Sequence, residues 1–188
     1  MNTRSPLTNK IRKKIIVVGE GGVGKTTLLH RSISHIFVDS TKMTIGTDFF
    51  IKKVDKPKEN GEENQGKQFF MLIWDFAGQE HFRFILKDYV RGAEGVILCF
   101  DLVRYRTLLK LYDWIDLLKE GGIWGNEDVE FFLVGTKNDL VQNNSEAVSQ
   151  EQIDMFKDEF NIKHFFRTSA LDSSGVDNLF KLINEYVF

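Results

Sequence analysis

Residues 14–32, KIIVVGEGGVGKTTLLHRS, decide the fold, because an apolar run, four glycines and a helix-forming segment follow one another there. The apolar run predicts a buried strand, and residues 25–35 predict a helix. Residues 19–26 between them match the pattern G-x-x-x-x-G-K-[ST]. Because glycine is unfavourable in backbone entropy, four glycines within six positions require a physical reason.

A bound phosphate supplies that reason. Without side chains, the backbone can wrap a phosphate so that successive N–H groups point inward, at the positive end of the following helix. The Lys25 ammonium can then reach the terminal phosphates, and the Thr26 hydroxyl can ligate magnesium. The residues expected to contact nucleotide here are Gly21, Gly22, Val23, Gly24, Lys25 and Thr26. This segment indicates a nucleoside triphosphate of unspecified base; a glycine turn without a ligand is the alternative.

Residues 74–80, WDFAGQE, add groups suited to a terminal phosphate and its metal. Asp75, at the end of a predicted strand, can reach magnesium through a water molecule. Gly78 offers an unobstructed backbone N–H, and the Gln79 amide can orient an attacking water. Thr44 can add a second hydroxyl to the metal when its loop closes. We expect Lys25, Gly78 and Gln79 to be catalytic, and Thr26, Thr44 and Asp75, the last through water, to hold the metal.

The segment FLVGTKNDL, residues 132–140, points to the base. It puts Thr136, Lys137 and Asp139 just beyond a predicted buried strand. A carboxylate such as Asp139 can accept two hydrogen bonds, from guanine N1–H and the 2-amino group, whereas adenine has no such pair of donors. A site built around that acceptor should reject ATP. The alternatives without a functional role are that Asp139 is a turn residue and Gln79 an ordinary surface amide.

The rest of the chain predicts one α/β domain. Further strands are expected at residues 44–54, 67–76, 95–102, 129–136 and 164–170, and helices at 80–91, across 108–118, after a Ser149–Gln152 capping box, and at 176–187. Near-continuous apolar strands separated by helices indicate a mostly parallel sheet covered on both faces. The direct connection through residues 55–67 makes one pair of strands antiparallel, as in a hairpin.

Composition limits the partners and the compartment. The 188 residues carry a net charge of −2, which gives no argument for nucleic acid, and no stretch is long and apolar enough to span a membrane. The single Cys99 cannot form an internal disulfide, which fits a reducing, cytoplasmic compartment. Residues 1–13 are expected to form a flexible basic arm, and 14–188 the folded domain. The chain starts Met-Asn and ends NEYVF, so we expect neither a myristoyl nor a prenyl anchor.

Taken together, GEGGVGKT, Thr44, DFAGQ, TKND and TSAL, in this order, resemble the nucleotide-binding motifs of the Ras-like small GTPases. The resemblance covers nearly all of residues 13–188. TIGTDF, LIWDFAGQEHFR and DYVRGAEGVILCFDL look most like the Rab branch, although the prenylation cysteine of that branch is missing from this sequence. The resemblance implies a G domain of the P-loop NTPase class: a mostly parallel six-stranded sheet with one antiparallel strand and helices on both faces.

The resemblance also implies roles for individual residues. Phe37 would pack edge-on against guanine, Thr27 would touch the α-phosphate, and Lys137 would lie along the base. The loop on the far edge of the base would contain Ser169, Ala170 and Leu171. Residues 37–48 and 75–92 would form two switch segments that close around the γ-phosphate and bind effectors, a GTPase-activating protein and an exchange factor. Thr136 stands where Asn is commonest in the Ras and Rab branches.

These expectations combine into a magnesium-dependent molecular switch that binds GTP and hydrolyses it to GDP, in signalling or membrane traffic. We expect intrinsic hydrolysis to be slow and the protein to be a monomer. We expect a cytoplasmic location, and peripheral attachment to a membrane surface is a further possibility that the sequence leaves open. One rival is a P-loop kinase or ATPase, against which Asp139 argues. A second rival is an interaction module that binds GTP with little or no hydrolysis, and the presence of Gln79 and Thr44 disfavours it.

Overall fold

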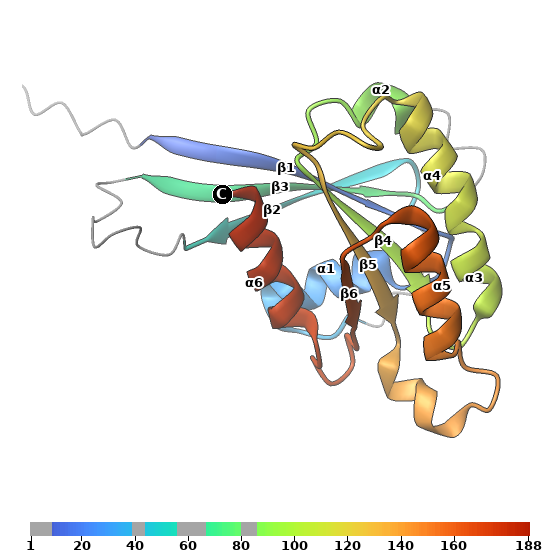
Figure 1. Cartoon of the computed structure of the whole chain (residues 1–188). Coiled ribbons are helices and arrows are strands. Elements are labelled where there is room, and N and C mark those ends of the chain that lie inside the picture. Colours follow the sequence, from blue (N-terminus) through green and yellow to red (C-terminus); the bar gives the residue numbers. More distant parts are fainter. Residues whose placement is uncertain (1–8, 39–43, 56–66, 80–85) are drawn as a thin grey trace, which may run out of the picture.

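The computed structural model describes residues 9–38, 44–55, 67–79 and 86–188. Within these ranges the chain forms a six-stranded sheet in the order β2-β3-β1-β4-β5-β6 (Figure 1). The strands are β1 (Lys10–Val18), β2 (Thr47–Val54), β3 (Gln68–Phe76), β4 (Gly95–Asp101), β5 (Glu130–Thr136) and β6 (His164–Arg167). The β2–β3 pair is antiparallel and every other pair is parallel, which confirms the expected fold class.

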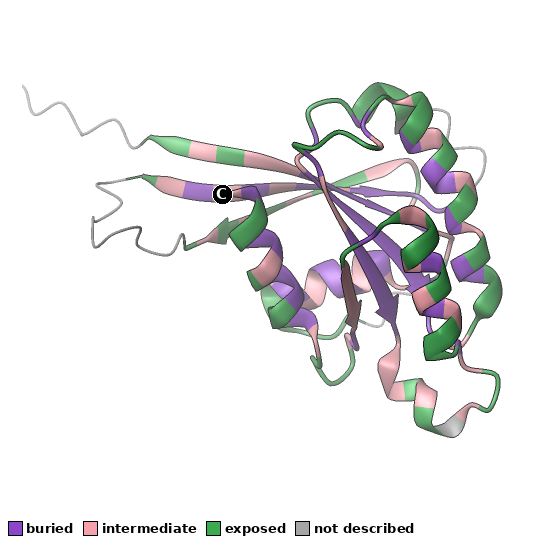
Figure 2. Ribbon diagram, in the orientation of Figure 1, coloured by how far each residue is buried: buried purple, intermediate pink, exposed green. Residues whose placement is uncertain are grey.

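Helices cover both faces of this sheet. They are α1 (Lys25–Ser34), α2 (Leu86–Tyr89), α3 (Tyr105–Leu109), α4 (Leu111–Glu120), α5 (Gln150–Phe160) and α6 (Val176–Val187). Apolar residues of α1 and α6 pack on one face with Val17 and Ile97, and those of α3, α4 and α5 pack on the other with Ile16 and Leu98. The central strand β4 is buried along its whole length (Figure 2), as expected for a strand covered on both faces.

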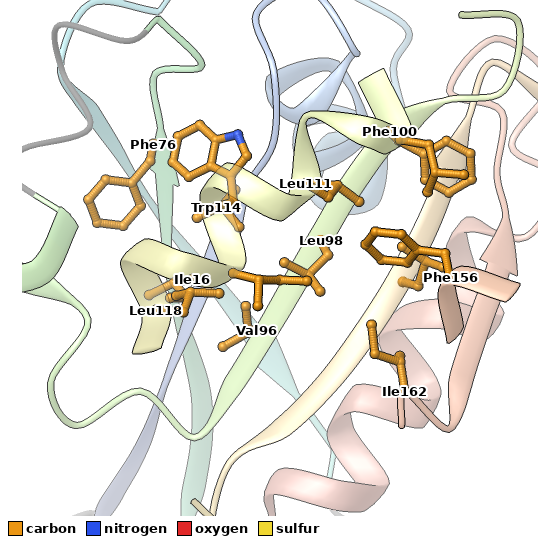
Figure 3. Packing of buried hydrophobic residues seen from close by; sticks show 14 of the residues in the cluster. Ile16, Phe76, Val96, Leu98, Phe100, Leu111, Trp114, Leu118, Phe156 and Ile162 are labelled. Carbon is orange, nitrogen blue, oxygen red and sulfur yellow. The ribbon is translucent and has the colours of Figure 1, made fainter. Parts of the chain in front are cut away.

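The larger core cluster lies under α4 and α5. Figure 3 shows Trp114 and Leu118 of α4 beside side chains of the sheet, and Trp114 is fully buried. Each large apolar side chain buried in this way stabilises the fold by roughly 1.5–3 kcal/mol. The core therefore fixes the carboxyl ends of the parallel strands, where the candidate site lies.

Some predicted boundaries need correction. The expected helix at 80–91 is seen as α2 over Leu86–Tyr89 alone, with residues 80–85 outside the described ranges. It ends before Val90 because that residue turns into the core and Gly92 follows with a φ of 74°. Across 108–118 the helix is divided at Lys110 into α3 and α4, and the last strand stops at Arg167 instead of residue 170. The capping box is confirmed: Ser149 and Gln152 exchange hydrogen bonds at the start of α5.

The expected flexible arm also ends earlier than the sequence suggested. Strand β1 begins at Lys10, because residues 10–13 pair with residues 68–71 of β3. The Lys13 ammonium also forms an ion pair with Glu94 at 2.6 Å. Residues 10–13 are therefore part of the sheet, and residues 1–8 of the arm lie outside the described ranges.

Candidate functional site

The glycine loop, residues 19–24, connects β1 to α1. It passes so close to β4 that a Cβ on Gly19 would lie 2.1 Å from the Cys99 carbonyl oxygen, which explains why this position has no side chain. The Lys25 ammonium reaches back over the loop and donates hydrogen bonds to the carbonyls of Gly19 (2.8 Å) and Glu20 (3.1 Å). The cap residue of α1, Gly24, has no side chain to cap the helix, and the N–H groups of a first helical turn are the groups that a helix offers to an anion.

Three side-chain oxygens from separate elements meet at the start of α1. The hydroxyl oxygens of Thr26 and Thr44 are 2.9 Å apart, and the Thr26 hydroxyl also donates to Asp75 Oδ2. Two ligands on adjacent corners of an octahedron around magnesium are about 3 Å apart, given metal–oxygen distances of about 2.1 Å. The three predicted metal-binding residues thus lie together, and their oxygen donors fit this hard cation.

Asp75 is a buried carboxylate whose environment does not fully balance its negative charge. It is buried at the end of β3, and its Oδ1 has no hydrogen-bond partner among the described residues. Burial raises the pKa of Asp75 to about 6, although the nearby Lys25 charge and the Thr26 hydrogen bond act to lower it. A divalent cation would supply the charge that this buried group lacks.

Gly78 lies directly against the glycine loop. A Cβ added to Gly78 would stand 2.1 Å from the Gly21 backbone nitrogen and 2.3 Å from the Glu20 carbonyl carbon. Any larger residue would push the segment after β3 away from the loop. The structure thus places Gly78, and Gln79 after it, beside the glycine loop.

A cavity of about 320 Å³ opens beside the glycine loop. Its lining includes Thr27 and Phe37, from α1 and the segment after it, and Lys137, Asp139, Ala170 and Leu171, from the segments after β5 and β6. These residues belong to segments that are distant in sequence; the carboxylate argument had assigned Asp139 to the base, and the resemblance had assigned the others to the nucleotide. Phe37 is 38% exposed, so it is a cavity wall and not a core residue.

The far side of this cavity is built on hydrogen bonds between the two predicted base-binding segments. Asp139 Oδ1 accepts a hydrogen bond from the Ser169 hydroxyl at 2.6 Å, and Ser169 Oγ in turn accepts from the Leu171 N–H at 3.2 Å. The Thr136 hydroxyl lies 2.6 Å from the Val23 carbonyl oxygen and 2.9 Å from that of Phe100. Thr136, at the end of β5, therefore links the glycine loop to β4.

Sequence reasoning missed three residues that hold these segments together: Arg31, Asp101 and Arg104. Arg31 joins α1 to the loop 169–171, and Asp101 and Arg104 join the end of β4 to the glycine loop. Arg31 and Asp101 lie within segments quoted above but were given no role there, and Arg104 lies outside them. A buried acid directly after an apolar strand was the only available signal, and it pointed to Asp101 alone.

Comparisons with known proteins find relatives over most of the chain. A model of the Ras family matches residues 14–188. Mouse Ras-related protein Rab-12 is 34% identical over 181 residues, which cover 96% of this chain and 69% of that protein. RABD1 of Arabidopsis thaliana is 38% identical over 170 residues, covering 90% and 76% of the two chains. The GTP-binding protein YPTM2 of Zea mays is 35% identical, covering 89% and 75%.

No helix within the described ranges is long and apolar enough to cross a membrane. The family match spans nearly the whole described sheet, including the glycine loop and both walls of the cavity. The chain therefore belongs to the Ras family of small GTPases, and its relatives include Ras-related proteins of the Rab type.

Proposed function

We propose that this protein is a molecular switch that binds GTP with magnesium, hydrolyses it to GDP and phosphate, and exchanges partners between the two states. The observation that carries the proposal is the meeting of Thr26, Thr44 and Asp75 at the foot of the glycine loop. Their oxygens lie at the same edge of the sheet as a cavity walled by Asp139 and Phe37. In this proposal the glycine loop holds the phosphates between the metal site and the base site.

Each residue has a distinct role in this proposal. Lys25 and the N–H groups of the glycine loop hold the phosphates, and Asp139 accepts the two guanine donors. Thr26, Thr44 and, through water, Asp75 hold magnesium, which when bound neutralises charge on the phosphate oxygens. Gly78 presents its N–H to the γ-phosphate, and Gln79 orients the attacking water. Water is the nucleophile, so no covalent intermediate with the protein is required.

We propose that intrinsic hydrolysis is slow and that a GTPase-activating protein supplies an arginine at Gly21. A Cβ on Gly21 would meet no heavy atom within 4 Å, so Gly21→Val should fold normally while filling the space that the arginine needs. Substitution of Gln79 by Leu removes the amide that orients water. Both variants should therefore bind GTP without hydrolysing it at the activated rate.

Single-turnover phosphate release tests these roles, with and without a cell lysate as a source of activator. We expect Gly21→Val and Gln79→Leu to slow release at least tenfold in the presence of lysate, whereas Gln68→Leu, at the far end of β3, should behave as wild type. Release unchanged in both site variants would show the assignments to be wrong. Tight GTP binding by the wild type without phosphate release under either condition would favour a GTP-binding interaction module instead.

The partners are proposed to bind at residues 37–48 and 75–92. An exposed aromatic cluster at these segments supports this proposal. Phe49 directly follows the first segment and Tyr89 lies within the second. Their side chains are 48% and 44% exposed, and each ring contacts Trp74. Aromatic side chains of this kind are enriched in protein interfaces. We further propose that the protein works as a monomer in the cytoplasm, attached peripherally to membranes through such partners, in membrane traffic.

A further inference from the structure

Arg104, the residue before α3, contacts the glycine loop from a segment that no motif includes. Its Nε donates a hydrogen bond to Asp101 Oδ2 at 2.7 Å, and its Nη2 donates to the Gly22 carbonyl oxygen, also at 2.7 Å. The side chain is 46% exposed, so Arg104 crosses the surface between the end of β4 and the loop.

Asp101 fixes Arg104 and a second cation in place. Its side chain is fully buried, and Oδ1 accepts the Val103 N–H at 3.0 Å. Its Oδ2 also lies 2.8 Å from the Lys137 ammonium, which donates to the same Gly22 carbonyl oxygen at 3.0 Å. One buried carboxylate thus positions two cations, and both cations draw one peptide carbonyl outward.

The direction of that carbonyl sets the direction of the next N–H. The peptide between Gly22 and Val23 is planar and trans, so its C=O and N–H groups point to opposite sides. With the carbonyl held toward Arg104 and Lys137, the Val23 N–H points away from these two side chains. Gly22 has a φ of 70°, which residues with a side chain rarely adopt, so this peptide needs support to keep its orientation. Hydrogen bonds from two cations also polarise the peptide and strengthen its N–H as a donor.

We propose that Arg104 is a positioning residue for the diphosphate of the bound nucleotide. It acts through the Gly22–Val23 peptide, whose N–H it aims at the β-phosphate. This inference rests on the proposed function and extends it to a residue outside the motifs. Arg104 itself touches neither phosphate nor base.

This role differs measurably from that of an ion pair that only supports the start of α3. A partly exposed pair contributes little to stability, so either role allows the variants to fold. A purely structural contact would affect GDP and GMP equally or not at all. A device that orients an N–H toward the β-phosphate affects GDP and spares GMP, which has only the α-phosphate.

The test compares Arg104→Met with Arg106→Met, an exposed arginine two residues further along α3, and with Arg104→Lys. Affinities for GDP and GMP are measured with magnesium by competition against a fluorescent GDP analogue, after circular dichroism has established folding. We expect Arg104→Met to weaken GDP binding about five- to tenfold and GMP binding less than twofold. Arg106→Met should match the wild type, and Arg104→Lys should recover most of the loss because its ammonium can still donate to the Gly22 carbonyl oxygen.

Three outcomes would overturn the inference: equal weakening of GDP and GMP, GDP binding as in Arg106→Met, or no recovery in Arg104→Lys. Each leaves the proposed function standing as long as the wild type binds GDP. If the wild type itself binds neither nucleotide, the proposed function fails and this inference fails with it.

Discussion

At the scale of single residues, Asp75 is the clearest sign that the folded chain is built for a ligand. A buried carboxylate with an unsatisfied oxygen is unfavourable for the protein alone, and its pKa is raised from 3.8 to about 6. The folded state therefore binds the Asp75 proton more tightly than the unfolded state does. Natural sequences keep such costs mainly where function requires them.

This linkage predicts a pH dependence of metal-free stability. The stabilisation from protonated Asp75 is complete below pH 4 and is lost as the pH rises to about 6, a change of up to about 3 kcal/mol at 1.36 kcal/mol per pKa unit. Urea unfolding in EDTA between pH 4 and 7.5 should show the loss in wild type and not in Asp75→Asn. Identical pH profiles for the two proteins would contradict the assignment. Magnesium binding should have the opposite trend, strengthening up to about pH 6, because the metal requires the ionised carboxylate.

At the scale of elements, Arg31 links the two walls of the base cavity. From α1 its Nε donates to the Ala170 carbonyl at 2.6 Å and Nη2 to the Leu171 carbonyl, while Nη1 donates to the His35 carbonyl at 2.6 Å. His35 ends α1 in a left-handed conformation, two residues before Phe37. One guanidinium therefore fixes both the loop 169–171 and the start of the segment that carries Phe37.

Loss of this clamp should loosen the base and leave the phosphates in place. Hydrogen bonds from a charged group contribute about 1.5–3 kcal/mol, so we expect Arg31→Met to raise the GDP dissociation rate roughly ten- to a hundredfold. GMP should be weakened by the same factor as GDP, in contrast to Arg104→Met. Release of a fluorescent GDP analogue measures the effect, with Arg12→Met, exposed at the far end of β1, as the control. Unchanged release in Arg31→Met would mean that the two walls hold their positions without the clamp.

These elements show which features of the structure could be predicted from the sequence and which could not. The loop 19–24, the strands and the capping box of α5 were predictable because each follows from local residue types at fixed spacing. Arg31 and Arg104 were not, because their contacts to Ala170 and Gly22 join residues 139 and 82 positions apart. The end of α2 was also missed: Val90, which follows it, is buried in the core, and Lys14 of β1 donates to the carbonyls of Tyr89 and Arg91 on either side. Helical periodicity carries no information about such a partner.

At the scale of the whole molecule, the candidate site exists only when both halves of the sheet are assembled. The proposed phosphate and metal groups follow β1 and β3, whereas the proposed base groups follow β5 and β6, on the other side of the central β4. A nucleotide that contacts both halves binds the folded chain and not the unfolded one. It must therefore stabilise the entire domain, which should unfold in a single cooperative transition.

That coupling allows base specificity to be read from thermal unfolding. At a concentration 100 times its Kd, GDP with magnesium should add about 2.7 kcal/mol, or roughly 5–11 °C in Tm for a chain of this size, and ADP at equal concentration should add almost nothing. Asp139→Asn should lose the GDP shift and gain one with xanthosine diphosphate. The Asn carbonyl still accepts from the base N1–H, while its amide now donates to the oxygen that replaces the 2-amino group. Calorimetry of both proteins with the three diphosphates checks this reversal. A Tm shift with ADP equal to that with GDP in the wild type would show that Asp139, although it lies in the cavity with its oxygen fixed by Ser169, does not select the base.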